Sequence, residues 1–160
     1  MVQTTATKTW TEKLKDDLEE VDSRRTKGKM VSRPEDRTWE DDRMVRSAMV
    51  VGELAGFTNM KVLHAFIAEM EPSGHSGKHT HTSEAIMLCL SGSGYSVIDG
   101  ERFDWAEGDV IVMPAYTVHQ HFNASDTEIF RFYTVSDYPL TSNLGLSRMD
   151  MTEPGSHATD

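Results

Sequence analysis

The spacing of apolar residues differs between the first fifty positions and the rest of the chain. Residues 9–21 are mostly charged, but their apolar members recur at intervals of four, four and three: Trp10, Leu14, Leu18 and Val21. This spacing predicts a helix with a narrow apolar stripe on one face. Thr9 or Thr11 is placed to cap its start.

Residues 22–46 mix both charge signs, contain Pro34 and have few apolar side chains. A segment of this composition cannot bury enough apolar surface to form its own core. We therefore predict that residues 1–48 are a helix and an arm that becomes ordered on contact, rather than a second domain. The alternative is a solvated extension.

Short apolar runs bounded by turn residues dominate the chain from Met49 onward. The pair Asp99-Gly100 between two runs is typical of a hairpin, and Pro114 ends another run. This pattern predicts an all-β sandwich or barrel over residues 49–140. The expected strands are 59–70, 85–90, 94–98, 102–105, 110–113, 118–122 and 128–135. Residues 141–160 are predicted to be a C-terminal tail whose last ten residues, including His157, are loose.

Composition excludes several classes of function. The 160 residues are a one-domain length, and the formal net charge of −10 is opposite to that of a nucleic-acid-binding surface. No apolar run is long enough to span a membrane, and the N-terminus lacks the apolar core of a secretory signal. The single cysteine, Cys89, excludes a disulfide framework or a multi-cysteine metal site within one chain. We expect a cytoplasmic protein without a membrane or nucleic-acid partner.

Four of the seven histidines form two close pairs. His79 and His81 are separated by one residue beside a predicted strand, and His119 and His121 repeat that spacing on another. Side chains two positions apart in a strand point to the same face, so each pair can present two imidazoles to one ion. Imidazole suits iron, nickel, copper and zinc. The alternative is a coincidence of polar residues at strand edges.

The residues around the two pairs follow two spaced motifs. These are Gly74-x4-His79-x-His81 followed by Gly92, and Gly108-x5-Pro114-x4-His119-x3-Asn123. They resemble the two motifs of the cupin family, although Tyr116 stands where the second motif usually has glycine. The first motif also has four rather than five residues between its glycine and histidine. The resemblance implies a small jelly-roll barrel, the double-stranded β-helix, with a metal inside.

The resemblance leaves one common cupin ligand in question. The family's glutamate would fall at position 85, which is Ala85, and the available acid is Glu84. A shift of one residue along a strand turns the side chain to the opposite face. Either Glu84 is not a ligand or a local bulge turns it inward, and we favour the first. The expected site is then formed by His79, His81 and His119, a neutral analogue of the two-histidine-one-carboxylate triad of Fe(II) oxygenases.

The segments around both pairs, residues 79–85 and 114–123, resemble those of gentisate 1,2-dioxygenase and hydroxynaphthoate dioxygenase. Those enzymes also lack the glutamate and bind Fe(II) through three histidines. The resemblance implies a dioxygenase that uses O2 to cleave a small hydroxylated aromatic compound, with His121 near the metal but not bound to it. Manganese, nickel or zinc are the other metals to consider. Those enzymes are usually two-cupin chains, whereas a single barrel is expected here.

Three further residues have candidate roles. Arg131 lies in an otherwise apolar strand and would clamp a substrate carboxylate if it pointed inward. The alternative is that it faces solvent or a subunit interface. Tyr116, like Tyr133, lines the pocket or packs against the barrel. His64 is ambiguous in the same way, and His75 is expected to be exposed in a Gly/Ser loop.

Alternation also predicts how the run 85–90 is oriented. Ala85, Met87 and Cys89 share the inward phase, which leaves an apolar row facing outward: Ile86, Leu88 and Leu90. An outward apolar row suggests a second layer or a homodimer or higher oligomer, and the N-terminal arm could cover it in cis or across a dimer.

Two other functions remain open from the sequence. A metal-dependent cupin can be a lyase, an isomerase or a diketone-cleaving dioxygenase, and a redox-inactive ion would favour the first two. A non-enzymatic barrel that binds a small molecule is the third possibility, because a fold does not imply a function.

Overall fold

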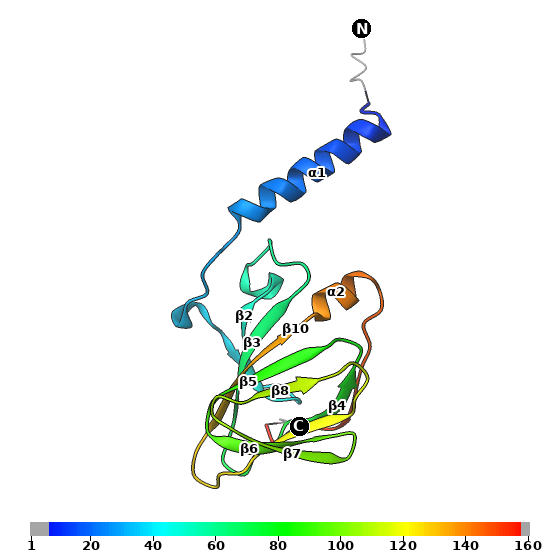
Figure 1. The fold of residues 1–160 in the computed structure, drawn as a ribbon. Helices are drawn as coiled ribbons and strands as arrows, with labels where there is room; N and C mark the ends of the chain where they lie inside the picture. Colours follow the sequence, from blue (N-terminus) through cyan, green and yellow to red (C-terminus); the bar gives the residue numbers. More distant parts are fainter. Residues whose placement is uncertain (1–6, 158–160) are drawn as a thin grey trace.

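The computed structural model describes residues 7–157, which form a β-barrel with one helix projecting from it (Figure 1). Two antiparallel sheets make the barrel, with strand orders β1-β2-β3-β10-β5-β8 and β11-β4-β9-β6-β7. The first sheet consists of β1 (Trp39–Glu40), β2 (Arg46–Val51), β3 (His64–Met70), β5 (Ala85–Ser91), β8 (Val110–Met113) and β10 (Phe130–Ser136). The second consists of β4 (Lys78–His81), β6 (Ser93–Ile98), β7 (Glu101–Ala106), β9 (His119–Asn123) and β11 (Met149–Glu153). The predicted all-β barrel is confirmed.

The core lies between the two sheets because the strands alternate between buried and exposed residues. On β5, Ala85, Met87 and Cys89 are buried, as predicted, and on β10 the buried residues include Phe130 and Phe132. Burying such side chains away from water is the main force that holds two sheets together. The alternation therefore fixes which side chains of each strand can reach the interior.

The outward row predicted on β5 is also present. Ile86, Leu88 and Leu90 are exposed, and register places Ile86 beside Val112 and Leu88 beside Val110 on the edge strand β8. The N-terminal helix does not cover this row. It runs as α1 (Trp10–Lys27) away from the barrel (Figure 1), and its apolar stripe is exposed.

The start of α1 follows the sequence signal closely. Thr9 is the N-cap: its side chain accepts a hydrogen bond from the backbone N–H of Glu12, and the carboxylate of Glu12 accepts one from the backbone N–H of Thr9. This reciprocal pair is a capping box. The helix continues past the predicted end at Val21, because residues 22–27 stay helical up to Gly28. Within residues 7–157, no helix combines the length and apolarity needed to cross a bilayer.

The arm after α1 contains the 3-10 turn η1 (Pro34–Asp36) and then joins the first sheet. Another 3-10 turn, η2 (Glu53–Ala55), follows β2, and a short helix, α2 (Tyr138–Asn143), follows β10. Strand pairing therefore begins before Met49, since β1 lies before it in the chain and β2 starts at Arg46. The strands of the two sheets therefore extend beyond the predicted barrel range of residues 49–140 at both ends, from β1 to β11.

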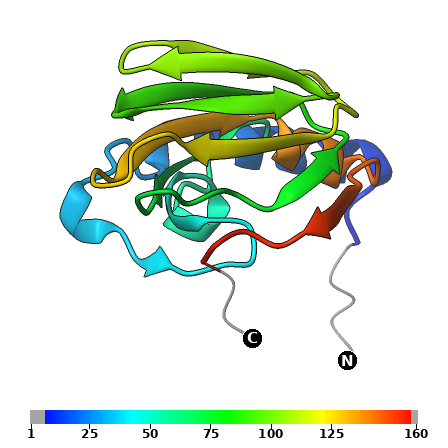
Figure 2. The ribbon, with the colours of Figure 1, turned by 90° about the horizontal axis from the view of Figure 1, so that it is seen from below.

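The last ten residues of the C-terminal tail, 151–160, were predicted to be loose, and this is wrong for residues 151–156. Residues 149–153 form β11, which pairs with β4 at the edge of the barrel, shown in red in Figure 2. The backbone N–H groups of Gly155 and Ser156 donate to the carbonyls of Arg43 and His75. Pairing along a free strand edge uses backbone groups, so a polar sequence can form it without an apolar signal.

Candidate metal centre

The two histidine pairs come together because β4 and β9 are neighbours in the second sheet. His79 lies directly opposite His119, with 4.3 Å between their ring centroids, and His81 lies on the same face of β4. One ring nitrogen from each of the three lies within 4.8 Å of the others. Three imidazoles from two adjacent strands therefore surround a single point.

The Nδ1 atoms of these three histidines all face backbone carbonyls. His79 Nδ1 lies 2.9 Å from the Gly77 oxygen, His81 Nδ1 2.7 Å from that of Ser83, and His119 Nδ1 3.0 Å from that of Thr117. A carbonyl only accepts hydrogen bonds, so each Nδ1 is the protonated nitrogen in the neutral ring. The lone pair is then on Nε2, which is the arrangement that metal-binding histidines commonly have.

Burial favours the neutral form of two of the three rings, His79 and His119. It lowers the pKa of His79 below the usual value and lowers the pKa of His119 to about 2, with the neighbouring histidines adding to the effect. A ring that cannot take up a proton keeps its lone pair free for a metal. Three neutral nitrogen donors fit a divalent transition ion such as iron, nickel or zinc.

His121 is near this cluster but has a different partner. Its ring centroid is 5.6 Å from that of His119, and its Nδ1 lies 2.7 Å from the Ser96 hydroxyl oxygen. The same oxygen accepts a hydrogen bond from the indole N–H of Trp105 at 2.9 Å. Indole nitrogen can only donate, and among the described residues the Ser96 hydroxyl has no acceptor for its own proton other than His121 Nδ1, so we assign that proton to the His121 contact. His121 therefore carries its proton on Nε2, the opposite tautomer from the other three.

The residues that hold His121 were not predicted from the sequence. Ser96 is completely buried on β6, and Trp105 reaches it from β7. Gly94 permits this approach, because a Cβ at that position would collide with the Trp105 indole. Burial lowers the pKa of His121 to about 3. A serine and a tryptophan in two separate strands leave no spacing pattern that points to a histidine on a third.

The acid in question, Glu84, lies outside the cluster. Its side chain is exposed, between the buried Ser83 and Ala85, and its backbone N–H donates to the carboxylate of Asp137 at 2.8 Å. Among the described residues, the group of side chains able to hold an ion consists of His79, His81 and His119, without a carboxylate. The alternation argument for this position therefore agrees with the structure.

Two predicted site residues lie elsewhere. Arg131 points away from the interior, because it alternates with the buried Phe130 and Phe132, and its Nε donates to Glu69 at 2.6 Å on the outer face. Tyr116 is 74% exposed and occupies the turn between β8 and β9 with φ of +68°. That left-handed conformation suits glycine, which explains why the second motif usually has glycine there. Of the two alternatives for Arg131, the structure has the one in which the side chain faces outward, so it is not placed to clamp a substrate. Tyr116 is not among the residues that line the cavity.

A cavity of about 310 Å³ opens beside the three histidines. His121 and Phe132 line it from the strands already described, and β11 adds Met149 and Met151 from the segment predicted to be a tail. His64 also lines it and stacks on Tyr138, with 5.5 Å between the ring centroids. His75 does not line it, and it is half-buried rather than exposed. The volume is at the lower end of the range for small-molecule sites.

Comparison with known proteins agrees with this geometry. Residues 66–136 match the family described as Cupin domain. The chain is 32% identical over 89 residues to 5-aminosalicylate 1,2-dioxygenase of a Comamonas species, a match that covers 55% of this chain and 23% of that protein. It is 28% identical over 93 residues to 1-hydroxy-2-naphthoate 1,2-dioxygenase of Nocardioides sp. strain KP7, covering 58% and 24%.

Among solved structures, salicylate 1,2-dioxygenase from Pseudoaminobacter salicylatoxidans, in a variant bound to gentisate, matches with a TM-score of 0.60 at 17% identity. The match covers 90% of this chain and 36% of that one, so the chain spans only a minor part of these relatives. The cupin fold and the resemblance to dioxygenases of aromatic compounds, both predicted from the motifs, are confirmed.

Proposed function

We propose that this cupin barrel is an oxidoreductase: an Fe(II)-dependent dioxygenase that cleaves a small hydroxylated aromatic compound with O2. The observation that carries the proposal is the division of tautomers among four neighbouring histidines. Three offer lone pairs to one point, and the fourth offers an N–H beside them. The names of the relatives support the reaction class, although the chain covers only about a quarter of each curated relative.

In this proposal His79, His81 and His119 hold the metal through Nε2. The backbone carbonyls of Gly77, Ser83 and Thr117 orient the three rings, as partners beyond the ligands commonly do. Bound Fe(II) would supply chelation of two adjacent substrate oxygens and activation of dioxygen. Because all three ligands are neutral, the ion would keep its full charge for that purpose.

His121 would act on the substrate rather than on the metal. Its Nε2–H is the hydrogen-bond donor it can offer within the cavity it lines, and the Ser96–Trp105 contact holds that tautomer in place. A donor fixed near the reacting atoms stabilises negative charge as it develops. The apolar walls around it, including Phe132 and Met113, limit the access of water.

The test is oxygen consumption by protein loaded anaerobically with Fe(II). Hydroxybenzoates, catechols and diketones are screened, and the matched control is the same protein loaded with Zn²⁺. We expect O2 uptake in equal proportion to the loss of an aromatic substrate, with Fe(II) only. Turnover under nitrogen would contradict the proposal and favour a lyase or isomerase. Tight binding without a product would instead favour a binding protein.

Two further expectations stay predictions. The outward apolar row on β5 and β8 is what led us to expect a homodimer or higher oligomer, and sedimentation of the purified chain measures this directly. The cytoplasmic location is likewise a prediction from composition, and fractionation of cells that express the protein would test it.

A further inference from the structure

The cavity beside the histidines lacks a positively charged side chain. Among the described residues that line it there is no arginine or lysine, and the only carboxylate is that of Asp42. Asp42 is exposed, and its Oδ1 is held by the backbone N–H of Met44 at 3.0 Å. Apart from a metal, the charge that the cavity presents to a ligand is therefore negative.

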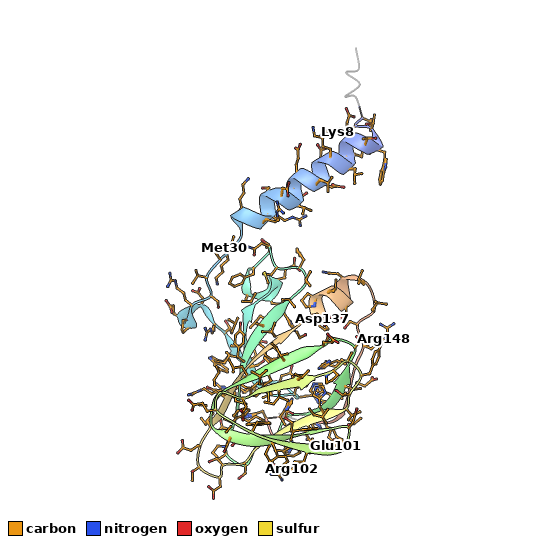
Figure 3. The ribbon with its side chains drawn as sticks, viewed as in Figure 1. Lys8, Met30, Glu101, Arg102, Asp137 and Arg148 are labelled. Carbon is orange, nitrogen blue, oxygen red and sulfur yellow. The ribbon has the colours of Figure 1, made fainter. Side chains whose placement is uncertain are left out.

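Three cations on or next to the barrel strands have their polar partners outside the cavity. Arg131 on β10 is paired with Glu69 on the outer face, and Lys78, which precedes His79, is paired with Glu153 at 3.1 Å. Arg148 precedes β11, is exposed and donates to the carbonyl of Ser147; Figure 3 shows its side chain at the outer margin of the barrel. None of these three lines the cavity.

The walls of the cavity favour an apolar ring. Five methionines contribute to them: Met44, Met49, Met113, Met149 and Met151. Thioether side chains adapt their shape and make favourable contacts with aromatic rings. Phe66 and Phe132 add flat apolar surface. A carboxylate placed against these walls would lose its hydration without gaining an ion pair, which is strongly unfavourable.

We infer that the substrate is a small one-ring chelator whose body, beyond the two atoms that reach the metal, is uncharged and apolar. The inference rests on the proposed function and narrows it. A carboxylate is accommodated only as one of the two chelating groups, where the metal neutralises it. A carboxylate elsewhere on the ring is rejected, because the cavity offers no cation and presents Asp42.

The test compares 4-methylcatechol with 3,4-dihydroxybenzoate. The two share the same chelating diol and differ by a methyl or a carboxylate group at one ring position. Binding to the full-length protein loaded with Co²⁺ is measured without oxygen, from the visible spectrum of the metal. We expect the methyl compound to bind at least tenfold more tightly. Equal affinities, or a preference for the carboxylate, would overturn the inference.

Matched variants separate charge from shape. Asp42→Asn keeps the side-chain oxygen that accepts a hydrogen bond from the backbone of Met44. This variant should reduce the difference in affinity between the two diols. Met149→Arg places a cation at the exposed edge of the cavity and should reduce the ratio of the two affinities at least fivefold, whereas Met149→Gln should leave that ratio unchanged. If none of these variants changes the difference in affinity between the two diols, charge does not set the preference and the inference fails.

The same data distinguish this inference from the proposed function. If neither diol alters the spectrum of the bound metal, the inference is overturned, because an uncharged one-ring chelator such as 4-methylcatechol should bind; the proposed function is then judged by O2 uptake with Fe(II) and the hydroxybenzoates. If both diols bind equally and O2 uptake still occurs with Fe(II), only the inference about the substrate's charge fails.

Discussion

Strands β4 and β9 each carry two histidines at the same spacing, yet they contribute unequally to the metal centre. Both histidines of β4 join the cluster, whereas β9 gives His119 to the cluster and His121 to a separate contact with Ser96. The difference does not come from spacing or from burial, since His119 and His121 are both buried. The ring of His121 lies outside the point at which the other three ring nitrogens meet, and the partner of its Nδ1 also differs. A carbonyl fixes one tautomer for His119, and the Ser96 hydroxyl, whose proton has no other acceptor among the described residues, fixes the other for His121.

The strongest way to break this comparison is to remove the members of the cluster one at a time. His79→Ala, His81→Ala and His119→Ala should each lose most of the bound metal, because two imidazoles rarely hold an ion that needs three. Elemental analysis of protein purified with added Fe(II) measures this. Glu84→Gln is the matched control and should keep a metal content near that of the wild type. Full metal content in any of the three alanine variants would contradict the ligand assignment.

The next largest effect is expected at His121, where a substitution should lower the turnover rate without lowering the metal content. His121→Asn should keep the metal but lower the turnover rate by roughly 10²–10⁴-fold, the usual contribution of a positioned proton donor. Ser96→Ala should lower the rate less, because the ring remains but its tautomer is no longer fixed. Long-range ¹⁵N–¹H NMR of Zn²⁺-loaded protein would show the change in tautomer, and Ser96→Thr should restore it. Loss of metal in His121→Asn would contradict the assignment of His119 as a metal ligand and His121 as a residue that does not bind the metal.

A smaller effect is expected in the pH dependence of the metal-free protein. Burial holds the pKa of His119 at about 2 and that of His121 at about 3 in the folded chain, against 6.5 for an exposed histidine. Below pH 6.5 the unfolded chain therefore binds more protons than the folded chain, so the free energy of unfolding falls as the pH falls.

Urea unfolding of metal-free protein between pH 7.5 and pH 5.5 would measure this slope, in a range above most carboxylate titrations. Replacing His121 with Asn should make the slope shallower. A midpoint that is constant across this range would show that the histidines are not held neutral by burial.

The smallest effect concerns the turn that leads into β9. Tyr116 has a left-handed backbone and an exposed side chain, so its strain is not offset by packing. Tyr116→Gly should therefore be more stable than Tyr116→Ala by about 1 kcal/mol, since only glycine adopts this conformation without strain. Thermal unfolding of the two variants measures the difference. An equal or greater stability of the alanine variant would contradict the argument.

The local sequence pattern was sufficient to predict the strands in which inward-facing and outward-facing residues alternate. The alternation of Ala85, Met87 and Cys89 predicted the inner face of β5, and the pairs of histidines predicted two ligand-bearing strands. Arg131 could have been placed by the same rule, because the apolar residues on both sides of it, Phe130 and Phe132, require the interior. The sequence analysis instead left a carboxylate clamp open beside the outward orientation.

Other features were beyond the sequence because they depend on tertiary contact. The backbone pairing of β11 with β4 needs no apolar residues, so a polar segment gave no sign of it. The tautomer of His121 depends on a serine and a tryptophan from two other strands. The conformation of Tyr116 was signalled only by its position in the motif, where glycine is usual, and the strain itself became visible in the backbone.

The place of β4 in its sheet has a consequence for how the protein folds. Both strands that flank it, β9 and β11, come from later in the chain, and Lys78 of β4 meets Glu153 across 75 positions. Contacts of such long range form slowly, because the entropy of closing the loop is lost before the contacts form. Two of the three metal-facing histidines are therefore fixed only when the most distant parts of the barrel have met. A metal ion would then stabilise the finished barrel rather than start its folding, and the rate of metal uptake during refolding would report the last closure.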